Sequence, residues 1–258
     1  MSGGGLAGKA LGRLPPRVDA RTLRFAKYAR ELVAPPPAQD WDCALPLRTP
    51  LYANDRIGDC AIVSAVSLAQ TWSAQNGAHF NPSVTDVVAD YSAVSGYRPT
   101  VEYAGFTTNE TDRGCDMLSV LTRWRKLGIA DRKILAFVKI DHDDIEQIKT
   151  AIRLFGGVYV GASLPRTAGS DAPWVGRAGK GDASIGSWGG HAMSCATYDR
   201  FGPWFRTWGR RQRASWLWWL DYVDEVYACL SADWIARDGF APNGFDLSAL
   251  RSDLQAIN

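Results

Sequence analysis

The stretch that most constrains the fold of this chain is residues 60–72, Cys-Ala-Ile-Val-Ser-Ala-Val-Ser-Leu-Ala-Gln-Thr-Trp. It holds no charged residue, and on a helix it places small or apolar side chains on nearly every side. A helix of this kind has to be buried, because none of its faces suits water. Asp59 can cap its first turn and Gly77 can end it. The sequence therefore predicts a central helix that other segments surround.

The segments after this helix change from helical to strand-like patterns. Two more helices are predicted at about 85–94 and 116–127, each closed by a glycine. The later apolar runs indicate strands at about 133–140, 158–164, 191–198, 204–208 and 226–230, with helices at about 143–154 and 216–225. Helices first and strands later predict an α+β fold with a helical lobe at about 39–130, a β lobe at about 131–258 and a cleft between them.

The composition excludes several other classes of protein. With 258 residues and 46% hydrophobic content, the chain suits one large domain or two small lobes. Its uncharged apolar runs are far shorter than the roughly 20 residues that cross a bilayer, so no membrane contact is predicted. Residues 1–16 lack the apolar core of a secretory signal, which favours a cytoplasmic location.

The placement of cysteine and histidine argues against metal binding and disulfides. The five cysteines are scattered without a CxxC pair, and the three histidines lie far apart. The run Asp141-His142-Asp143-Asp144 precedes a predicted helix, where carboxylates usually complement the helix dipole. We therefore predict no metal site and no cofactor.

Residues 1–38 form a separate basic arm, rich in glycine and proline at its two ends. The arm holds seven basic side chains against two acidic ones, whereas the whole chain has a net charge of only +2. That small net charge argues against a nucleic-acid partner. Apolar residues at about 23–33 approximate a short amphipathic helix. This helix either packs on its own domain or docks onto a protein assembly partner.

Cys60 is the first candidate for chemistry. A cysteine in the first turn of a buried helix meets unpaired N–H groups and the positive end of the helix dipole, which favour the thiolate. Gly58 allows close approach of the backbone, and the amide of Asn54 could donate a hydrogen bond to an oxygen held beside the sulfur. The alternative is that Cys60 is simply a small buried residue.

His191 is the second candidate, because it starts a predicted strand directly after a glycine-rich loop. A ring at such a position can face a cleft, and a cysteine nucleophile needs an imidazole to take its proton and later return it. Trp188 and Gly190 are predicted to line the cleft wall. A structural role for the histidine is the alternative, but together with Cys60 the catalytic interpretation is favoured.

Several short motifs together resemble those of a known family. They are Asp40-Trp41, Asn54 six residues before the cysteine, Gly58-Asp59-Cys60, His191-Ala192 followed by Tyr198, and Thr207-Trp208-Gly209. In this order the chain resembles the papain-like (C1-type) cysteine peptidases over roughly residues 40–235. The set Asn-Asp-Arg-x-Gly-Asp-Cys, Gly-Ser-Trp-Gly-Gly-His-Ala and Thr-Trp-Gly is most similar to a group of bacterial and phage papain-fold proteins of unassigned function.

The resemblance implies a papain-like domain at 39–258, with a helical N-terminal lobe and an antiparallel, β-barrel-like C-terminal lobe. It implies a thiol hydrolase that acts on a peptide or amide substrate with a Cys60–His191 pair and no cofactor. Asn54 stands where the family has its oxyanion glutamine, and Trp208 stands where a tryptophan shields the histidine.

The chain departs from the family pattern at the residue that orients the histidine. Arg206 replaces the usual asparagine, and an arginine has only donors, so it cannot accept the imidazole N–H. Asp199 or a backbone carbonyl is the alternative acceptor. Asn54 is shorter than glutamine, and Ile57 replaces a disulfide cysteine, which agrees with a reducing compartment.

These departures leave two further functions open. One is a papain-fold structural or binding protein without hydrolysis, for example a virion component that docks through residues 1–38. The other is acyl transfer by the same cysteine, because water and an amine compete for one thioester.

Overall fold

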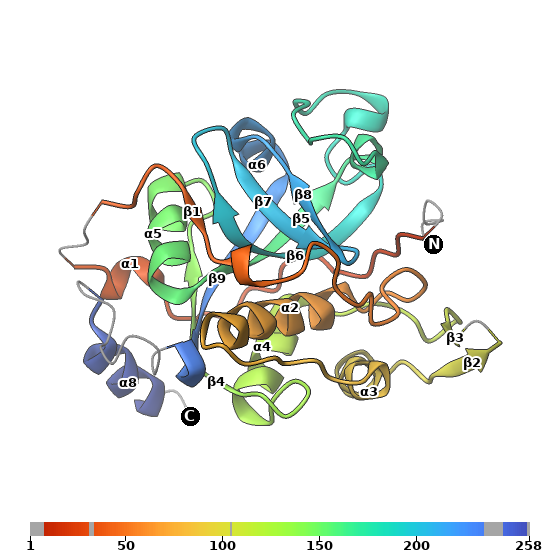
Figure 1. Cartoon of the computed structure of the whole chain (residues 1–258), viewed down its shortest axis with the longest axis horizontal. Coiled ribbons are helices and arrows are strands. Elements are labelled where there is room, and N and C mark those ends of the chain that lie inside the picture. The colour runs from red at the N-terminus through yellow and green to blue at the C-terminus, as the bar shows by residue number, and fades with distance from the viewer. Residues whose placement is uncertain (1–7, 31–33, 104, 235–244, 257–258) are drawn as a thin grey trace.

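A seven-stranded antiparallel sheet lies at the centre of the β lobe, and the helices pack around it (Figure 1). The computed structural model describes residues 8–30, 34–103, 105–234 and 245–256. In spatial order the strands are β4 (Ile134–Ile140), β9 (Val223–Ser231), β5 (Val158–Leu164), β6 (Gly189–Tyr198), β7 (Pro203–Thr207) and β8 (Arg210–Arg213), and β1 (Gln39–Asp40) pairs with β6. The α+β fold class is confirmed. Within the described residues the sheet ends at β4 and β8, so the lobe is not a closed barrel.

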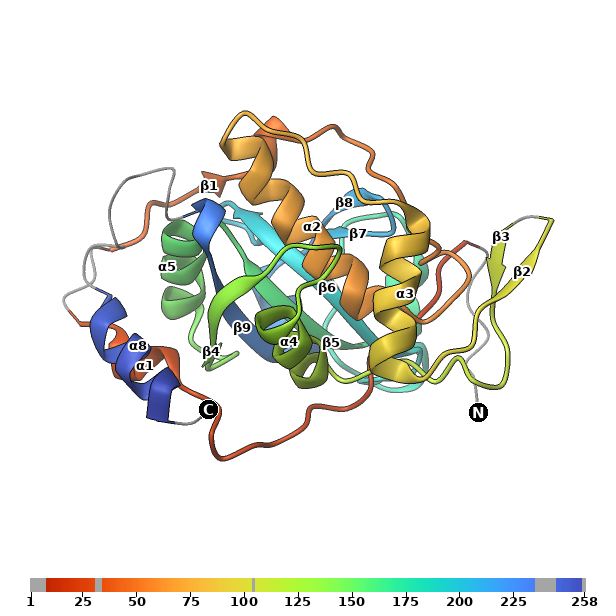
Figure 2. The same ribbon diagram turned by 90° about the horizontal axis from the view of Figure 1, so that it is seen from below.

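The helical lobe lies along one face of this sheet (Figure 2). Its centre is α2 (Cys60–Gln75), which begins at the predicted residue and packs across β6. Beside it lie α3 (Val84–Ser95), which starts with a Ser83–Asp86 capping box, and α4 (Met117–Lys126), which is capped by Asp116. A small hairpin of β2 (Thr100–Glu102) and β3 (Gly105–Thr107) projects beyond α3 and was not predicted from the sequence.

A second group of helices packs on the sheet away from α2. It consists of α5 (Ile145–Phe155), α6 (Trp216–Tyr222), α8 (Leu247–Ala256) and the four-residue α1 (Phe25–Tyr28). The arm helix is therefore much shorter than the predicted 23–33, and residues 31–33 lie outside the described residues. Phe25 and Tyr28 are both 0% exposed, so this part of the arm packs on its own domain.

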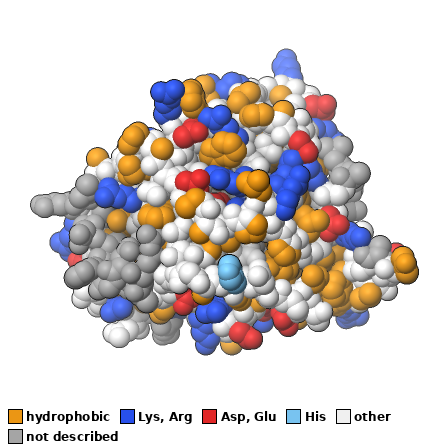
Figure 3. All heavy atoms as spheres, in the orientation of Figure 1, with side chains coloured by type: hydrophobic (Ala, Val, Ile, Leu, Met, Phe, Trp, Pro, Cys, Tyr) orange, Lys and Arg blue, Asp and Glu red, His pale blue; other side chains and the backbone are white. Residues whose placement is uncertain are grey.

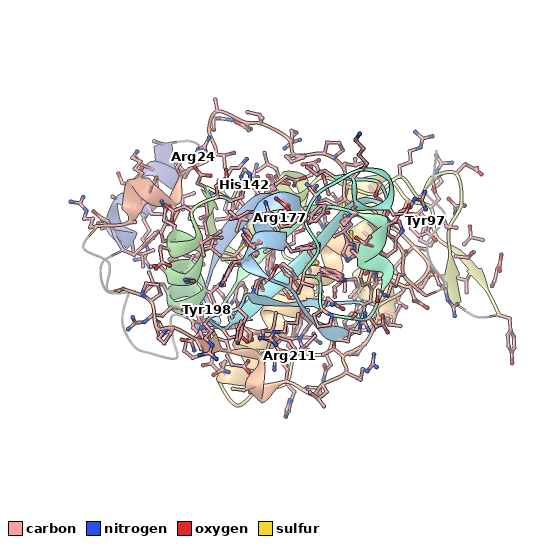
Figure 4. All side chains as sticks on the ribbon, turned by 90° about the horizontal axis from the view of Figure 1, so that it is seen from above. Arg24, Tyr97, His142, Arg177, Tyr198 and Arg211 are labelled. Atoms are coloured by element: carbon pink, nitrogen blue, oxygen red, sulfur yellow. The ribbon has the colours of Figure 1, made fainter. Side chains whose placement is uncertain are left out.

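A long loop at residues 165–188 connects β5 to β6. It carries two short 3-10 turns, η2 (Arg166–Gly169) and η3 (Gly181–Ala183). Arg177 binds Asp221 at 2.6 Å, and the hydroxyl of Tyr222 donates to the Ala183 carbonyl at 2.8 Å. Figure 4 shows Arg177 beside α6, where these contacts tie the loop to the domain.

Charges of both signs are interspersed over the surface. Three arginines of β8, which the sequence places beside several tryptophans, each have a carboxylate partner: Arg210 pairs with Asp171, Arg211 with Asp40 and Arg213 with Asp199. On the face drawn in Figure 3, Lys and Arg side chains lie next to Asp and Glu side chains. The described helices include none that is long and apolar enough to span a membrane.

Candidate active site

Cys60 is the first residue of α2, and its side chain is buried against the start of β6. The Ala192 N–H donates a hydrogen bond to Cys60 Sγ at 3.4 Å. Ala192 directly follows His191, so the contact joins the helical lobe to the strand that carries the candidate base. Asp59 occupies the N-cap position, but its side chain makes no cap hydrogen bond. Burial raises the pKa of Asp59 well above its usual value, whereas a hydrogen bond from the Asn54 side chain lowers it.

The ring of His191 is held by two neighbours and is fully buried. It stacks on Trp208 with a centroid distance of 4.3 Å and an interplanar angle of 15°. Its Nε2 atom lies 2.6 Å from Thr207 Oγ1. A hydroxyl can accept from Nε2–H, which leaves the lone pair of Nδ1 free to take a proton. Among the described residues, none forms a hydrogen bond with Nδ1.

Thr207 is the residue that the sequence analysis missed. The family pattern drew attention to Arg206, but successive residues of a strand point to opposite faces. Arg206 therefore points away from the histidine. It pairs with the buried Asp42 at 3.5 Å and donates to the Pro46 carbonyl at 3.2 Å. Strand alternation applied to residues 206–208 could have pointed to Thr207.

Asp199 lies in the turn between β6 and β7, away from the histidine. Its carboxylate accepts from the Phe201 N–H at 2.8 Å and pairs with Arg213 at 2.8 Å. It stabilises the turn, and the structure gives it no contact with the ring it was expected to orient.

The predicted oxyanion donor, Asn54, is buried at 2% exposure. Together with Thr207, Trp208 and Ala192 it lines a small cavity of about 10 Å³. The amide lies beside the carboxyl of Asp59, whose pKa it lowers, so an oxygen that enters the cavity would compete with Asp59 for this donor.

Residues 8–14 of the arm run through the cleft between the two lobes. The Ala10 N–H donates to Asn54 O, and the Arg13 N–H donates to Gly190 O, both at 3.1 Å. On the opposite side, the Cys115 N–H donates to Gly12 O at 2.9 Å, and the Leu14 N–H donates to Cys115 O at 3.1 Å. Figure 1 shows this segment entering beside the N mark and passing between β6 and α2. The arm is thus hydrogen-bonded to both lobes.

Glycines make this close approach possible. A Cβ added to Gly12 would lie 1.9 Å from Gly58 O, and a Cβ on Gly190 would lie 2.2 Å from Arg13 O. A Cβ on Gly114 would lie 1.9 Å from Gly12 O. Gly58 and Gly190, expected to line the cleft, therefore lie directly against the arm backbone. Trp188, the other predicted wall residue, packs on Trp208 at 5.5 Å.

Burial favours the uncharged forms of both candidate catalytic groups. Desolvation raises the pKa of Cys60 to about 11, despite hydrogen bonds from the Ala192 and Gly12 N–H groups. Desolvation, together with the nearby charges of Arg13 and Lys9, lowers the pKa of His191 to about 3. The helix N-terminus was expected to favour a thiolate, but in this covered state burial outweighs it.

The acidic run ahead of α5 lies outside this site. Asp144 accepts from the Gln147 N–H at 2.9 Å and caps the helix, as a carboxylate there is expected to do. Asp141, His142 and Asp143 lie close together on the surface, where Figure 4 labels His142. Exposed groups of this kind are common without an ion.

Solved structures with the same fold are cysteine proteases. Xylellain, a cysteine protease from Xylella fastidiosa, is similar with a TM-score of 0.65 at 16% identity, over 87% of this chain and 97% of its own. The Carica candamarcensis cysteine protease CMS1MS2 gives 0.51 at 13% identity, over 76% and 99%. The protease and lectin-like domains of Cwp84, from Clostridium difficile, give 0.52 at 14% identity, over 80% and 56%.

These likenesses define the fold of the chain. No protein-family model and no curated protein matches its sequence. The chain has the papain-like cysteine protease fold, which confirms the resemblance drawn from its motifs.

Proposed function

We propose that the protein is a papain-type thiol hydrolase of peptide or amide bonds, and that residues 8–14 keep it latent. The observation that carries the proposal is the contact of Cys60 Sγ with the backbone beside His191, in a region that residues 8–14 of the arm cover. A merely structural cysteine has no need of a buried imidazole nitrogen without a hydrogen-bond partner among the described residues nearby.

The chemistry follows from these groups once the arm leaves. His191 Nδ1 takes the proton from Cys60 Sγ while the sulfur attacks the carbonyl carbon of the substrate. The carbonyl oxygen becomes negative and accepts hydrogen bonds from the Cys60 N–H and Asn54 Nδ2. The imidazolium then gives its proton to the leaving amine, and a thioester remains on Cys60. A water molecule, deprotonated by the same nitrogen, releases the acid product.

The seated arm is bound in a geometry that does not react. Gly12 O accepts a hydrogen bond from the Cys115 N–H at 2.9 Å, so this carbonyl is already engaged on the side of Cys115. The arm can therefore lie on the nucleophile without being cleaved there. We infer that loss or displacement of residues 8–14 precedes activity.

The second candidate is a papain-fold binding protein without hydrolysis. The neutral state of Cys60 and His191 favours it, since an uncharged pair is a weak nucleophile. Its virion form, acyl transfer to an amine and a cytoplasmic location stay predictions from the sequence. An anchored α1 with buried Phe25 and Tyr28 gives this part of the arm little free surface for a partner.

The test uses the full chain with Gly12→Ala, which displaces the arm by steric clash, and a panel of fluorogenic peptide amides. We expect the Gly12→Ala chain to hydrolyse at least one of these peptides. Adding Cys60→Ala should lower the rate of hydrolysis at least about a thousandfold. Cys43→Ala removes an exposed free cysteine and is the matched control that keeps full activity. If the arm is displaced but no peptide is hydrolysed, the result would support the second candidate, a binding protein without hydrolysis.

A further inference from the structure

Arg13 of the arm fills a buried pocket next to the cleft. Its side chain is only 1% exposed although the residue belongs to a surface segment. Its Nη2 lies 2.8 Å from Asp224 Oδ2, and its Nη1 lies 3.3 Å from Glu225 Oε2. Ser163 Oγ lies 3.4 Å from Nη2 and donates to Asp224 Oδ2 at 2.6 Å.

The domain, not the arm, builds this pocket. Gly161 of β5 forms one wall, because a Cβ there would lie 2.9 Å from Arg13 Cδ. The pairing of β5 with β9 is irregular at this point: Gly161 opposes Glu225, and Ala162 opposes Val223. Asp224 is the extra residue of the bulge. A bulge redirects side chains, so two adjacent carboxylates that would point to opposite faces both reach one guanidinium.

The two carboxyls of the pocket pair with a cation, which offsets the burial that raises the pKa of Glu225. The side chain of Glu225 is 0% exposed, and besides the contact with Arg13 it accepts a hydrogen bond from the Tyr227 hydroxyl at 2.7 Å. A buried carboxylate without a counter-charge is costly, and removal of one partner of a buried pair typically costs about 3–5 kcal/mol.

We propose that this pocket is a specificity site, which takes an arginine or lysine side chain of the peptide substrate and which Arg13 occupies while the arm is seated. This inference rests on the proposed hydrolase function. The pocket lies close to Cys60 along the chain of the arm, because the backbone N–H of Gly12, one residue before Arg13, is hydrogen-bonded to the sulfur. A substrate backbone that takes the place of the arm brings one of its side chains to the same pocket.

The test compares peptide amides that differ at one position, Arg, Lys, citrulline or Leu, in the Gly12→Ala chain. Each position on the amino-terminal side of the cleaved bond is varied in turn. At one of these positions, we expect kcat/KM for Arg and Lys to exceed that for Leu and citrulline by at least about tenfold. Glu225→Gln removes this preference, because the pocket loses its buried charge. Asp233→Asn removes a half-exposed carboxylate elsewhere and is the matched control. Hydrolysis without a basic preference at any position would overturn the pocket and leave the hydrolase standing.

A second measurement does not depend on turnover. In the full chain, iodoacetamide labelling of Cys60, mapped by mass spectrometry, reports whether the arm is seated. We expect Arg13→Lys to stay protected and Arg13→Leu to be labelled at least about tenfold faster. In Gly12→Ala, N-acetylarginine amide should slow the labelling more than its citrulline counterpart. If no peptide is hydrolysed, the proposed function fails. If both amides slow the labelling equally, the cation pocket is overturned, whatever the result with the peptides.

Discussion

At the scale of single residues, glycines allow the backbone of the arm to lie against the backbone of the cleft. Gly12 and Gly58 touch through their backbones, and Gly190 touches Arg13 O in the same way. No side chain could be added at these positions without displacing the arm. A methyl group is therefore enough to change the state of the whole site.

Gly12→Ala is expected to release the arm from the cleft. The new Cβ would lie 1.9 Å from Gly58 O and 2.4 Å from Gly58 Cα, and backbone atoms cannot move aside as a flexible side chain can. We expect iodoacetamide to label Cys60 at least about tenfold faster than in the unchanged chain. Gly176→Ala is the control, because a Cβ there meets nothing within 4 Å. Equal labelling rates in the two variants would contradict the steric argument.

Thr207 is expected to position His191 through its hydroxyl. In the Gly12→Ala background, Thr207→Val keeps the shape and loses the hydrogen bond of 2.6 Å to Nε2. We expect kcat to fall by roughly 10- to 100-fold, less than the about 100- to 10,000-fold that acid–base catalysis supplies, with little change in KM. Thr207→Ser retains the hydroxyl and should restore most of the activity. A loss of the same size in both variants would indicate a packing role only.

At the scale of elements, the short α1 joins the arm to the core. Phe25 lies 6.2 Å from Phe155 and 5.5 Å from Phe245 between ring centroids. These rings belong to α5 and to the start of the C-terminal segment, so three distant parts of the chain meet there. Four residues make a marginal helix by themselves, and packing of its two buried rings stabilises it instead.

Phe25→Ala is expected to destabilise the domain by about 3–5 kcal/mol, because the ring is fully buried among aromatic neighbours. Chemical denaturation followed by fluorescence measures this change in the free energy of unfolding. Val18→Ala, on an arm residue that is 89% exposed, should change it by less than about 0.5 kcal/mol. If both variants unfold alike, α1 contributes nothing to the fold and is available to a partner.

At the scale of the whole molecule, the arm links the two lobes. Its backbone is hydrogen-bonded to Asn54 and Cys115 in the helical lobe and to Gly190 in the β lobe. Lys9 adds a contact of 2.8 Å to Asp171 in the long loop. The closed state therefore depends on several weak contacts and on an uncharged His191, which couples it to pH.

Acid is expected to favour opening of the cleft. The pKa of His191 is lowered from its usual 6.5 to about 3 by burial and by the charges of Arg13 and Lys9. An open state with the usual pKa binds a proton below pH 6.5, whereas the closed state does not until about pH 3. The closed state thus loses stability as pH falls through this window. The ratio of closed to open molecules falls by up to about tenfold per pH unit.

Hydrogen exchange of the amides of residues 10–14 between pH 7 and pH 4, corrected for intrinsic rates, measures this opening. We expect protection to decrease with falling pH in the unchanged chain and to depend less on pH in His191→Asn. His79→Gln, which removes an exposed histidine, should behave like the unchanged chain. Protection that stays constant in the unchanged chain would contradict the linkage.

Much of the fold could be predicted because its signals are local. The all-round apolar pattern after Asp59 gives α2, glycines end α3 and α5 where they were expected, and the strand positions follow from apolar runs. The candidate site was predictable only in part. Cys60, His191 and Asn54 stand out through the residues next to them in the chain, whereas the threonine beside the imidazole is revealed by strand alternation.

The sequence by itself determined the α+β order and singled out Cys60, His191 and Asn54 as candidates, because apolar periodicity and short motifs act within a few residues. Only the tertiary structure decided that the arm lies in the cleft, that Thr207 meets the ring and that the bulge at Asp224 turns two carboxylates toward Arg13. These outcomes depend on strand register and on backbones that meet across more than a hundred residues. No local preference encodes such contacts; packing of the complete chain creates them.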